Sequence, residues 1–252
     1  MTTSKSAVVT GANKGIGHEV ARRLAAAGFK VWLGARDAGR GAAAAQALRA
    51  EGLDVDWLPI DVTKDESVAA AAKAVAAVGP CLDALVNNAG VAVRYLESLG
   101  PDGRYDLPPS RERIADIQAI YDVNVFGPIR VTQAFLPLLL AAPAARIVMV
   151  SSYLGSIGRA LDPASAAYSL NIMGYGSSKT ALNAITIAFA KELAPRGVKV
   201  NAAAPGYTAT DLNGHRGRRT APQAAEIVVR LATLAADGPT AGYFDDEGAL
   251  PW

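Results

Sequence analysis

The strongest constraint on the fold of this chain is a regular alternation of short β-branched runs with alanine-rich stretches. Because strands that alternate with helices pair in parallel and are covered on both faces, this pattern predicts an α/β fold with a doubly wound parallel sheet of about seven strands. The expected strands are residues 6–9, 30–33, 55–58, 84–86, 146–150, 198–203 and 243–244. Helices are expected over residues 17–27, 39–50, 65–78, 111–141, a stretch that includes 175–193, and 222–234.

Length and composition favour one domain and disfavour several functions. The 252 residues suit a single large α/β domain over residues 1–252. There are 25 basic and 23 acidic side chains, a formal charge of +2, with no long run of either sign, so a nucleic-acid partner is not expected. Cys81 is the only cysteine and has no Cys or His at metal-ligand spacing, so no metal site is expected and a reduced compartment is favoured.

The distribution of apolar residues argues against a membrane location. The first residues run directly into the strand at 6–9, which leaves no room for the apolar region of a signal peptide. The most apolar stretch, residues 135–150, is interrupted by Pro137, Pro143 and Arg146 and is too short between these breaks to span a bilayer. The protein is therefore expected in the cytoplasm and not in a membrane.

A glycine-rich turn, residues 10–17 (TGANKGIG), separates the first expected strand from the first expected helix. Glycines there permit a tight turn and let backbone amides and a helix N-terminus approach a pyrophosphate, where the helix dipole favours negative charge. The spacing Gly-x-x-x-Gly-x-Gly differs from the common dinucleotide fingerprint Gly-x-Gly-x-x-Gly. An ordinary strand-to-helix loop is the alternative, but the strand, turn and helix context favours a dinucleotide site.

Basic residues follow the second expected strand, at the place where an acidic residue would hold the ribose hydroxyls of NAD. Arg36 and Arg40 would receive the 2′-phosphate of NADPH, and Lys14 in the glycine turn would add a third cation. The alternatives are that Arg36 and Arg40 are solvated loop charges and that Asp37 is the ribose ligand. The cations favour NADPH over NADH as the cofactor.

A tyrosine and a lysine four residues apart, Tyr175 and Lys179, are the candidate acid/base pair. In a helix the two side chains project from one face, since positions i and i+4 stack along it. A cation beside the phenol lowers the tyrosine pKa from its usual value of about 10, which suits the phenol to general acid/base work. A surface pair that arises by chance is the alternative, and the neighbouring motifs argue against it.

Over essentially its whole length the chain resembles the short-chain dehydrogenase/reductase family, and within it the monomeric NADPH-dependent carbonyl reductases. The motifs that carry this resemblance are the glycine turn, Asp61-Val62, Asn87-Asn88-Ala89-Gly90, Asn124, Ser151-Ser152, Tyr175 with Lys179, and Pro205-Gly206. The resemblance implies a Rossmann-type fold that binds NADP(H).

The resemblance also implies a role for each matching residue. Tyr175 is the expected proton donor to a carbonyl oxygen, Lys179 would lower its pKa and hold the nicotinamide ribose, and Ser152 would hydrogen-bond the same oxygen. Ser151 is the rival of Ser152, which is preferred because the family places its serine second in this pair. Asn124 would hold a water that relays protons to Lys179, or is simply a buried hydrogen-bonding residue. The expected cofactor-binding residues are Gly11, Asn13, Lys14, Gly15, Ile16, Gly17, Arg36, Arg40, Asp61, Val62, Asn88, Ala89, Gly90, Tyr175, Lys179, Pro205, Gly206 and Thr208.

The substrate side departs from the common pattern of the family. Residues 153–174 form a longer segment than in most members and a shorter one than the insertion of the monomeric carbonyl reductases. Because that insertion covers a surface that other members use for oligomerisation, both a monomer and a homo-oligomer are compatible with the sequence. The segment forms either a lid over an apolar pocket or a packed surface loop. Leu154 and Tyr207 match positions that line the substrate in related reductases.

Two further segments are interpreted as loops. Residues 91–110 contain three prolines and no clear period, and a long loop near the site is expected there. Residues 215–219 (HRGRR) are interpreted as a solvated basic loop, with attraction of an acidic substrate as the alternative. Neither His18 nor His215 has a partner pattern that would make it a ligand or a base.

Together these features predict an NADPH-dependent oxidoreductase that reduces ketone or aldehyde carbonyls, with a small-molecule carbonyl or alcohol as its substrate. One alternative keeps the fold and makes the reaction alcohol or steroid oxidation, or 3-oxoacyl reduction. Another, from a different class, is a catalytically idle NADP-binding sensor. The intact set of Asn124, Ser152, Tyr175 and Lys179 argues against the sensor.

Overall fold

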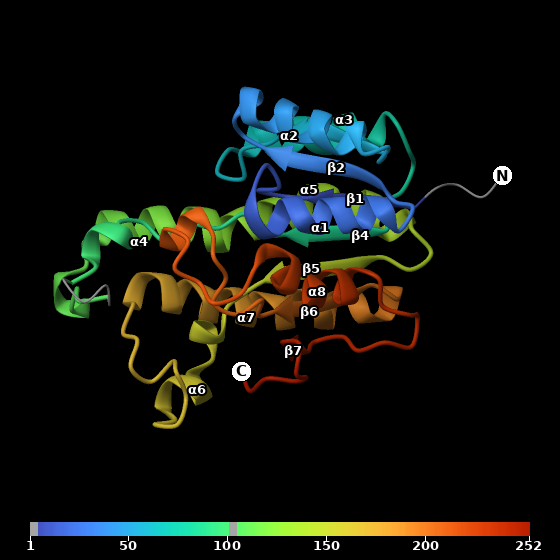
Figure 1. Cartoon of the computed structure of the whole chain (residues 1–252). Coiled ribbons are helices and arrows are strands. Elements are labelled where there is room, and N and C mark those ends of the chain that lie inside the picture. The colour runs from blue at the N-terminus through green and yellow to red at the C-terminus, as the bar shows by residue number, and fades with distance from the viewer. Residues whose placement is uncertain (1–4, 101–104) are drawn as a thin grey trace.

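The central feature of the computed structural model, which describes residues 5–100 and 105–252, is a seven-stranded sheet. Its spatial order is β3-β2-β1-β4-β5-β6-β7, and every neighbouring pair is parallel (Figure 1). The predicted doubly wound parallel sheet is confirmed. The strands are Ser6–Val9 (β1), Lys30–Ala35 (β2), Val55–Pro59 (β3), Ala84–Asn87 (β4), Arg146–Val150 (β5), Lys199–Ala203 (β6) and Tyr243–Phe244 (β7).

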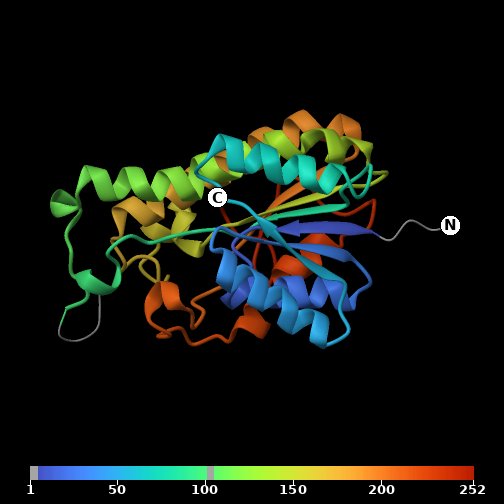
Figure 2. The same ribbon diagram turned by 90° about the horizontal axis from the view of Figure 1, so that it is seen from above.

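Helices cover both faces of this sheet, as Figure 2 shows. Successive strand residues point to opposite faces, so Val8 and Val9 of β1 belong to two different hydrophobic cores. The core on the side of Val9 takes in Leu24, and the core on the side of Val8 takes in Phe135. The first face is covered by α1 (Gly15–Ala26), α2 (Ala38–Ala50) and α8 (Ala221–Ala232), and the second by α3 (Asp65–Ala76), α5 (Gly127–Ala141) and α7 (Met173–Leu193).

Short helices lie in the connections between these elements. Two of them are α-helical, α4 (Ile114–Tyr121) and α6 (Ile157–Leu161). The others are 3-10 helices at Leu96–Ser98, Pro109–Arg111, Tyr153–Gly155, Ala194–Arg196 and Asp211–Asn213. The segment 91–110 is otherwise irregular over its described residues, as predicted, while residues 101–104 lie outside the described part of the chain.

The prediction of one continuous helix over residues 111–141 is wrong in two respects. Helix α4 begins only at Ile114, because the backbone of Arg113 is extended. The segment Asp122–Phe126 then forms a π-helical turn before α5 begins. A π turn holds one more residue than an α-turn and is often found at functional sites. Here it places Asn124 in a fully buried position.

By length and composition, Ile114–Ala141 is the one helical run among the described residues that could cross a membrane, with a mean hydropathy of 1.3. Half of that window is buried inside the fold. Helix α5 packs against α3, and α4 packs against α7. This packing accounts for the apolar composition of the run, because a buried core helix needs apolar side chains around much of its surface.

The order of the strands determines where a ligand can bind. The chain leaves β1 toward α1 on one face of the sheet and leaves β4 toward the helices of the other face. Between these two strands the connections diverge and open a crevice outside the carboxyl ends of the sheet, where open α/β sheets bind their ligands.

Candidate active site

A pocket of about 750 Å³ opens at this crevice. Its volume lies within the range of roughly 300–1,000 Å³ found for small-molecule sites. Every cofactor, catalytic and substrate residue predicted above lines the pocket, with the exception of Asn124. The topology brings these residues together because each motif follows a different parallel strand, and the carboxyl ends of parallel strands meet at one edge.

The glycine turn forms a cradle of backbone amides at one end of the pocket. Gly11 has a φ of +63°, and a Cβ at this position would lie 2.9 Å from the Cα of Ala89, so both the conformation and the close approach require glycine. The side-chain nitrogen of Asn88, Nδ2, donates to the carbonyl oxygens of Thr10 (2.9 Å) and Gly11 (3.1 Å) and fixes the turn against β4. Lys14 precedes the first residue of α1, and no side chain among the described residues forms a capping hydrogen bond at this N-terminus. The first amides of this helix therefore fit a pyrophosphate.

The cations predicted for a 2′-phosphate all border the pocket, and two of them are ion-paired. The Arg40 guanidinium lies 3.1 Å from the Asp37 carboxylate, which also accepts the Arg40 backbone N–H at 2.8 Å and caps α2. This capping role argues against Asp37 as the ribose ligand. The Lys14 ammonium is paired with Asp211, a residue that follows β6.

Burial dominates the protonation of the candidate acid/base pair. It raises the pKa of Tyr175 to about 12, although a hydrogen bond with Ser152 acts in the opposite direction. It also lowers the pKa of Lys179, which is 3% exposed, to about 8. The Lys179 ammonium donates to the Val150 carbonyl (2.9 Å) and lies 5.6 Å from the centre of the Tyr175 ring. The net pKa of Tyr175 is thus raised and not lowered as predicted, because burial is the largest influence on it.

Asn124 lies beside the pocket and ties its wall to the helix that carries Tyr175. Its Oδ1 accepts the Val91 N–H (2.8 Å), and its Nδ2 donates to the Val91 carbonyl (2.9 Å) and to the Ser178 hydroxyl (3.1 Å). A Cβ at Gly90 would lie 3.5 Å from Oδ1 and 3.6 Å from the Lys179 ammonium. Asn124 is thus a buried hydrogen-bonding residue next to the lysine, and its part in a proton relay stays a prediction.

The two adjacent serines after β5 have different surroundings. The Ser151 hydroxyl donates to the Asn183 side-chain oxygen at 2.6 Å and is 3% exposed. The Ser152 side chain interacts with Tyr175 and acts to lower its pKa, while the Ser152 backbone carbonyl accepts from the buried Tyr243 hydroxyl. Ser151 has no such effect on the candidate acid, which favours the predicted choice between the two serines.

Two tyrosines that the motifs did not indicate border the end of the pocket that faces Tyr175. Tyr153 and Tyr95 line it together with the predicted Leu154 and Tyr207, and Tyr95 is hydrogen-bonded to Tyr207. Burial raises the pKa of both Tyr153 and Tyr95, so their hydroxyls stay neutral. Tyr153 could have been found from its place directly after Ser152. Nothing in the spacing of Tyr95 indicates its position.

The segment 153–174 is a pocket wall at its two ends and a surface segment between them. Leu154, Leu170 and Ile172 line the pocket. Ile157 and Leu161, on α6, are 59% and 74% exposed. Each of the two predicted alternatives, lid and surface loop, thus describes part of this segment.

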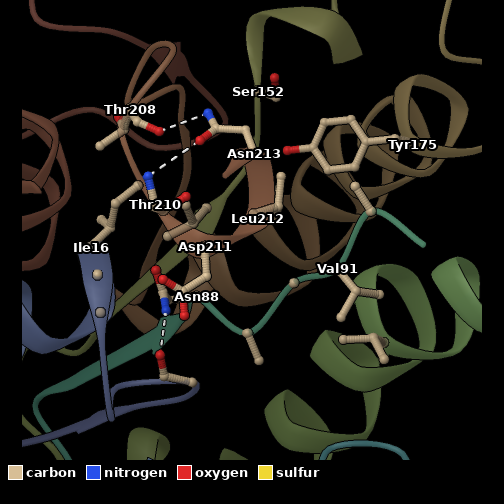
Figure 3. Close-up of a pocket in the computed structure, with 18 of the residues that line it drawn as sticks. Ile16, Asn88, Val91, Ser152, Tyr175, Thr208, Thr210, Asp211, Leu212 and Asn213 are labelled. Atoms are coloured by element: carbon tan, nitrogen blue, oxygen red, sulfur yellow. Dashed lines mark hydrogen bonds between the residues drawn. The ribbon is translucent and has the colours of Figure 1, made fainter. Parts of the chain in front are cut away.

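The loop after β6 closes one side of the pocket, as Figure 3 shows. The Asn213 side chain holds its shape by donating to the Thr208 carbonyl (2.9 Å) and accepting the Thr210 N–H (3.3 Å). Residues 210–213 were not predicted as site residues, since they carry no recognisable motif. His215 has a carboxylate partner, since its Nε2 lies 2.8 Å from Asp211. That it is neither a ligand nor a base stays a prediction.

The comparisons with known proteins agree with this geometry. The family model for short chain dehydrogenases matches residues 5–221. The chain belongs to the short-chain dehydrogenase/reductase family. Like other members, this dehydrogenase is an oxidoreductase. It is 34% identical to a short-chain dehydrogenase, anuI, of Penicillium roqueforti, over 98% of this chain and 96% of the relative.

Two reductases also resemble this dehydrogenase over nearly all of its length. The (-)-isopiperitenone reductase of Mentha piperita is 33% identical, with 97% of both chains covered. That alignment spans 308 positions, so the plant enzyme contains residues that the 252-residue dehydrogenase lacks. The crystal structure of an NADPH-bound carbonyl reductase from chicken fatty liver superimposes with a TM-score of 0.82, at 28% identity and with 99% of both chains covered.

Proposed function

We propose that this oxidoreductase is an NADPH-dependent carbonyl reductase, which reduces a ketone or an aldehyde to the alcohol. The observation that carries the proposal is the pocket, which brings Ser152, Tyr175 and Lys179 together with the glycine turn. Burial raises the pKa of Tyr175, so its phenol is protonated at neutral pH. A protonated phenol beside a second hydroxyl can donate a proton to a carbonyl oxygen. The two reductases among the relatives support this reading.

The lining of the pocket fits the cofactor that we propose. The amides at the start of α1 would hold the pyrophosphate, and Lys14, Arg36 and Arg40 would hold the 2′-phosphate. The other residues that we propose for cofactor binding are Gly11, Asn13, Gly15, Ile16, Gly17, Asp61, Val62, Asn88, Ala89, Gly90, Tyr175, Lys179, Pro205, Gly206 and Thr208.

Four side chains of this protein would guide the reaction. When bound, the cofactor supplies the hydride that reduces the carbonyl carbon. Ser152 would orient the carbonyl oxygen by a hydrogen bond, and Tyr175 would donate the proton that this oxygen gains. The Lys179 ammonium would stabilise the phenolate that Tyr175 becomes. Asn124 keeps its proposed part in returning a proton toward Lys179.

We further propose that residues 1–252 act as one domain in the cytoplasm, with a small-molecule carbonyl or alcohol as partner. A single sheet with continuous cores on both faces supports the first statement, and the lone Cys81 supports the second. Leu154 and Tyr207 would contact the substrate, together with Tyr95 and Tyr153.

The test is to follow NADPH consumption with a panel of ketones, aldehydes, quinones and acyl thioesters, in the wild type and in Tyr175→Phe. We expect turnover of ketones or aldehydes that falls by a factor of at least about 10² in the variant, the lower end of general-acid catalysis. Binding of NADPH, measured by its fluorescence, should persist in the variant. Turnover that survives in Tyr175→Phe would contradict the role of the tyrosine, whereas NADPH binding without turnover of any compound would favour a sensor.

A further inference from the structure

The loop that closes the pocket after β6 is tied to the glycine turn by an ion pair. Asp211 in this loop is paired with Lys14, and its second carboxylate oxygen lies 2.8 Å from the Nε2 of His215. In the view of Figure 3, Asp211 and Leu212 lie between Ile16 of the glycine turn and Tyr175. The pair therefore joins the proposed cofactor end of the pocket to a loop that also borders the substrate end.

The position of Asp211 is defined by the backbone around it. It begins the 3-10 helix Asp211–Asn213, which has a capping box formed by Thr210 and Asn213. Gly214 follows with a φ of +61° and ends the turn. A Cβ at Gly15 would lie 3.4 Å from the Thr210 methyl group, so the loop packs directly on the glycine turn. Asp211 is thus held beside Lys14 by local structure as well as by charge.

Lys14 is one of the three cations proposed for the 2′-phosphate, and its pairing differs from that of the others. Arg40 is paired with Asp37 on the same helix, through a carboxylate already engaged as the cap of α2. Lys14 is paired with a carboxylate that comes from the other side of the pocket. The hydrogen bond from Lys14 is the main reason why the pKa of Asp211 lies below its usual range, so Asp211 is anionic at neutral pH.

We propose that Asp211 competes with the 2′-phosphate of the cofactor for Lys14 and so sets how strongly the protein prefers NADP(H) to NAD(H). This inference rests on the proposed function. A phosphate carries about two negative charges at neutral pH, so a phosphate on Lys14 would meet the like charge of Asp211 nearby. NAD(H) lacks this phosphate and leaves the pair between Lys14 and Asp211 intact. Asp211 therefore weakens the binding of NADP(H) and not that of NAD(H).

The expected effect is modest because the pair is half exposed, with 53% of the Lys14 side chain and 52% of the Asp211 side chain accessible. Exposed pairs of this kind change an equilibrium by a factor of about two to five. Asp211→Asn, which keeps the shape and removes the charge, should lower the Kd for NADP⁺ by this factor and leave the Kd for NAD⁺ unchanged. Lys14→Met should raise the Kd for NADP⁺ and reduce the effect of Asp211→Asn in the double variant.

Both dissociation constants can be measured by titration calorimetry on the full chain, without substrate. Asp54→Asn is the matched control, because Asp54 is also a surface carboxylate paired with a lysine, Lys30 at 2.6 Å, but lies outside the pocket. It should change neither constant. Equal constants for NADP⁺ in wild type and Asp211→Asn, or an equal shift for NADP⁺ and NAD⁺, would overturn the inference. A wild type that binds neither nucleotide would instead contradict the proposed function.

Discussion

The pKa values of Tyr175 and Lys179 are shifted in opposite directions from those of an exposed tyrosine and an exposed lysine. Burial raises the pKa of the phenol to about 12 and lowers that of the ammonium to about 8. In both cases burial shifts the equilibrium toward the neutral form, because it disfavours charge. At neutral pH the phenol is neutral and the ammonium is still charged. A neutral phenol is the form that donates a proton, which suits reduction of a carbonyl. Oxidation of an alcohol needs the phenolate, and the pKa of Tyr175 makes that form rare at neutral pH.

The pKa of Lys179 predicts a pH profile for the reduction. Below about pH 8 the lysine is charged and can stabilise the phenolate that Tyr175 becomes, whereas above this pH the charge is lost. We expect kcat for ketone reduction to be constant up to about pH 8 and to fall by about tenfold per pH unit above it. The measurement is the initial rate at saturating NADPH and ketone.

Lys179→Arg is the variant that separates this effect from other titrations. Arginine keeps its charge throughout this range, so the fall above about pH 8 should disappear from whatever activity the variant retains. Circular dichroism of the variant is the check that it is folded. A wild-type profile that stays flat between about pH 8 and pH 10 would contradict the assignment.

At the level of single residues, the sequence identified those pocket residues that belong to a motif at the end of a strand. The glycine turn, Ser152 and Tyr175 all line the pocket as expected. Asp211 and Tyr95 were missed because each comes from an irregular segment, and such a segment is placed by tertiary contacts that leave no periodic signal. The pKa of Tyr175 was predicted in the wrong direction because the sequence shows the spacing of the pair and not its burial.

Among the helices, α7 has an unusual N-terminus that connects it to the pocket wall. The Glu112 carboxylate accepts the backbone N–H groups of Met173 (2.7 Å) and Gly174 (2.8 Å). These are the two residues that directly precede Tyr175. Glu112 is also hydrogen-bonded to Tyr105, which stacks on Tyr95 with ring centroids 5.7 Å apart. An anion at a helix N-terminus stabilises the helix through its amides and its dipole. Glu112 therefore joins the loop 91–112 to the start of the helix that carries the proposed acid.

Removal of this carboxylate should affect both stability and activity. Glu112→Ala is expected to lower the free energy of unfolding by about 1 kcal/mol, as the loss of a helix cap does. It should also lower kcat/KM for the ketone several-fold, because the start of α7 and the pocket wall lose their link. Urea unfolding and steady-state kinetics measure the two effects.

Two further variants test whether the effect of Glu112→Ala is specific. Glu112→Gln keeps an acceptor oxygen and should restore most of the activity. Glu66→Ala removes an acid from the first turn of α3 and should leave kcat/KM unchanged. An unchanged kcat/KM in Glu112→Ala would show that the link does not influence the site.

At the level of elements, apolar periodicity located the helices but not the interruption of the run 111–141. The residues of Asp122–Phe126 are compatible with an α-helix, and a single extra residue in a turn changes the pattern too little to be seen. The short α6 was missed for a similar reason, since five residues give no period.

For the whole molecule, stability depends on the two cores that flank the sheet. Phe135 is fully buried in the core that α3, α5 and α7 cover. Phe135→Ala should lower the free energy of unfolding by about 3–5 kcal/mol, through lost transfer energy and the cavity left behind. Denaturant unfolding monitored by circular dichroism measures this change.

Phe126 on the same helical run is 49% exposed and provides the matched control. Phe126→Ala should cost less than about 1 kcal/mol, since surface substitutions have small effects. A similar loss of unfolding free energy in both variants would contradict the difference in burial between Phe135 and Phe126.

The architecture of the whole molecule was largely predictable, because alternating strands and helices allow few topologies and most strand residues are apolar. The arrangement of the long loops was not. Residues 91–97, the two ends of segment 153–174 and the loop after β6 meet around the pocket although they lie far apart in the sequence, and their mutual contacts depend on the finished sheet.

The π turn at Asp122–Phe126 positions Asn124 by means of one extra residue, and the packing of the helices on either side does not depend on that residue. The one additional residue is absorbed within this turn, so α4 and α5 keep their buried faces on either side of it. A deletion of one residue here would restore an uninterrupted helix whose flanks pack as before, while Asn124 would be drawn back from Val91 and Ser178. A change of chain length, with Asn124 itself retained, would thus be enough to remove the asparagine contact.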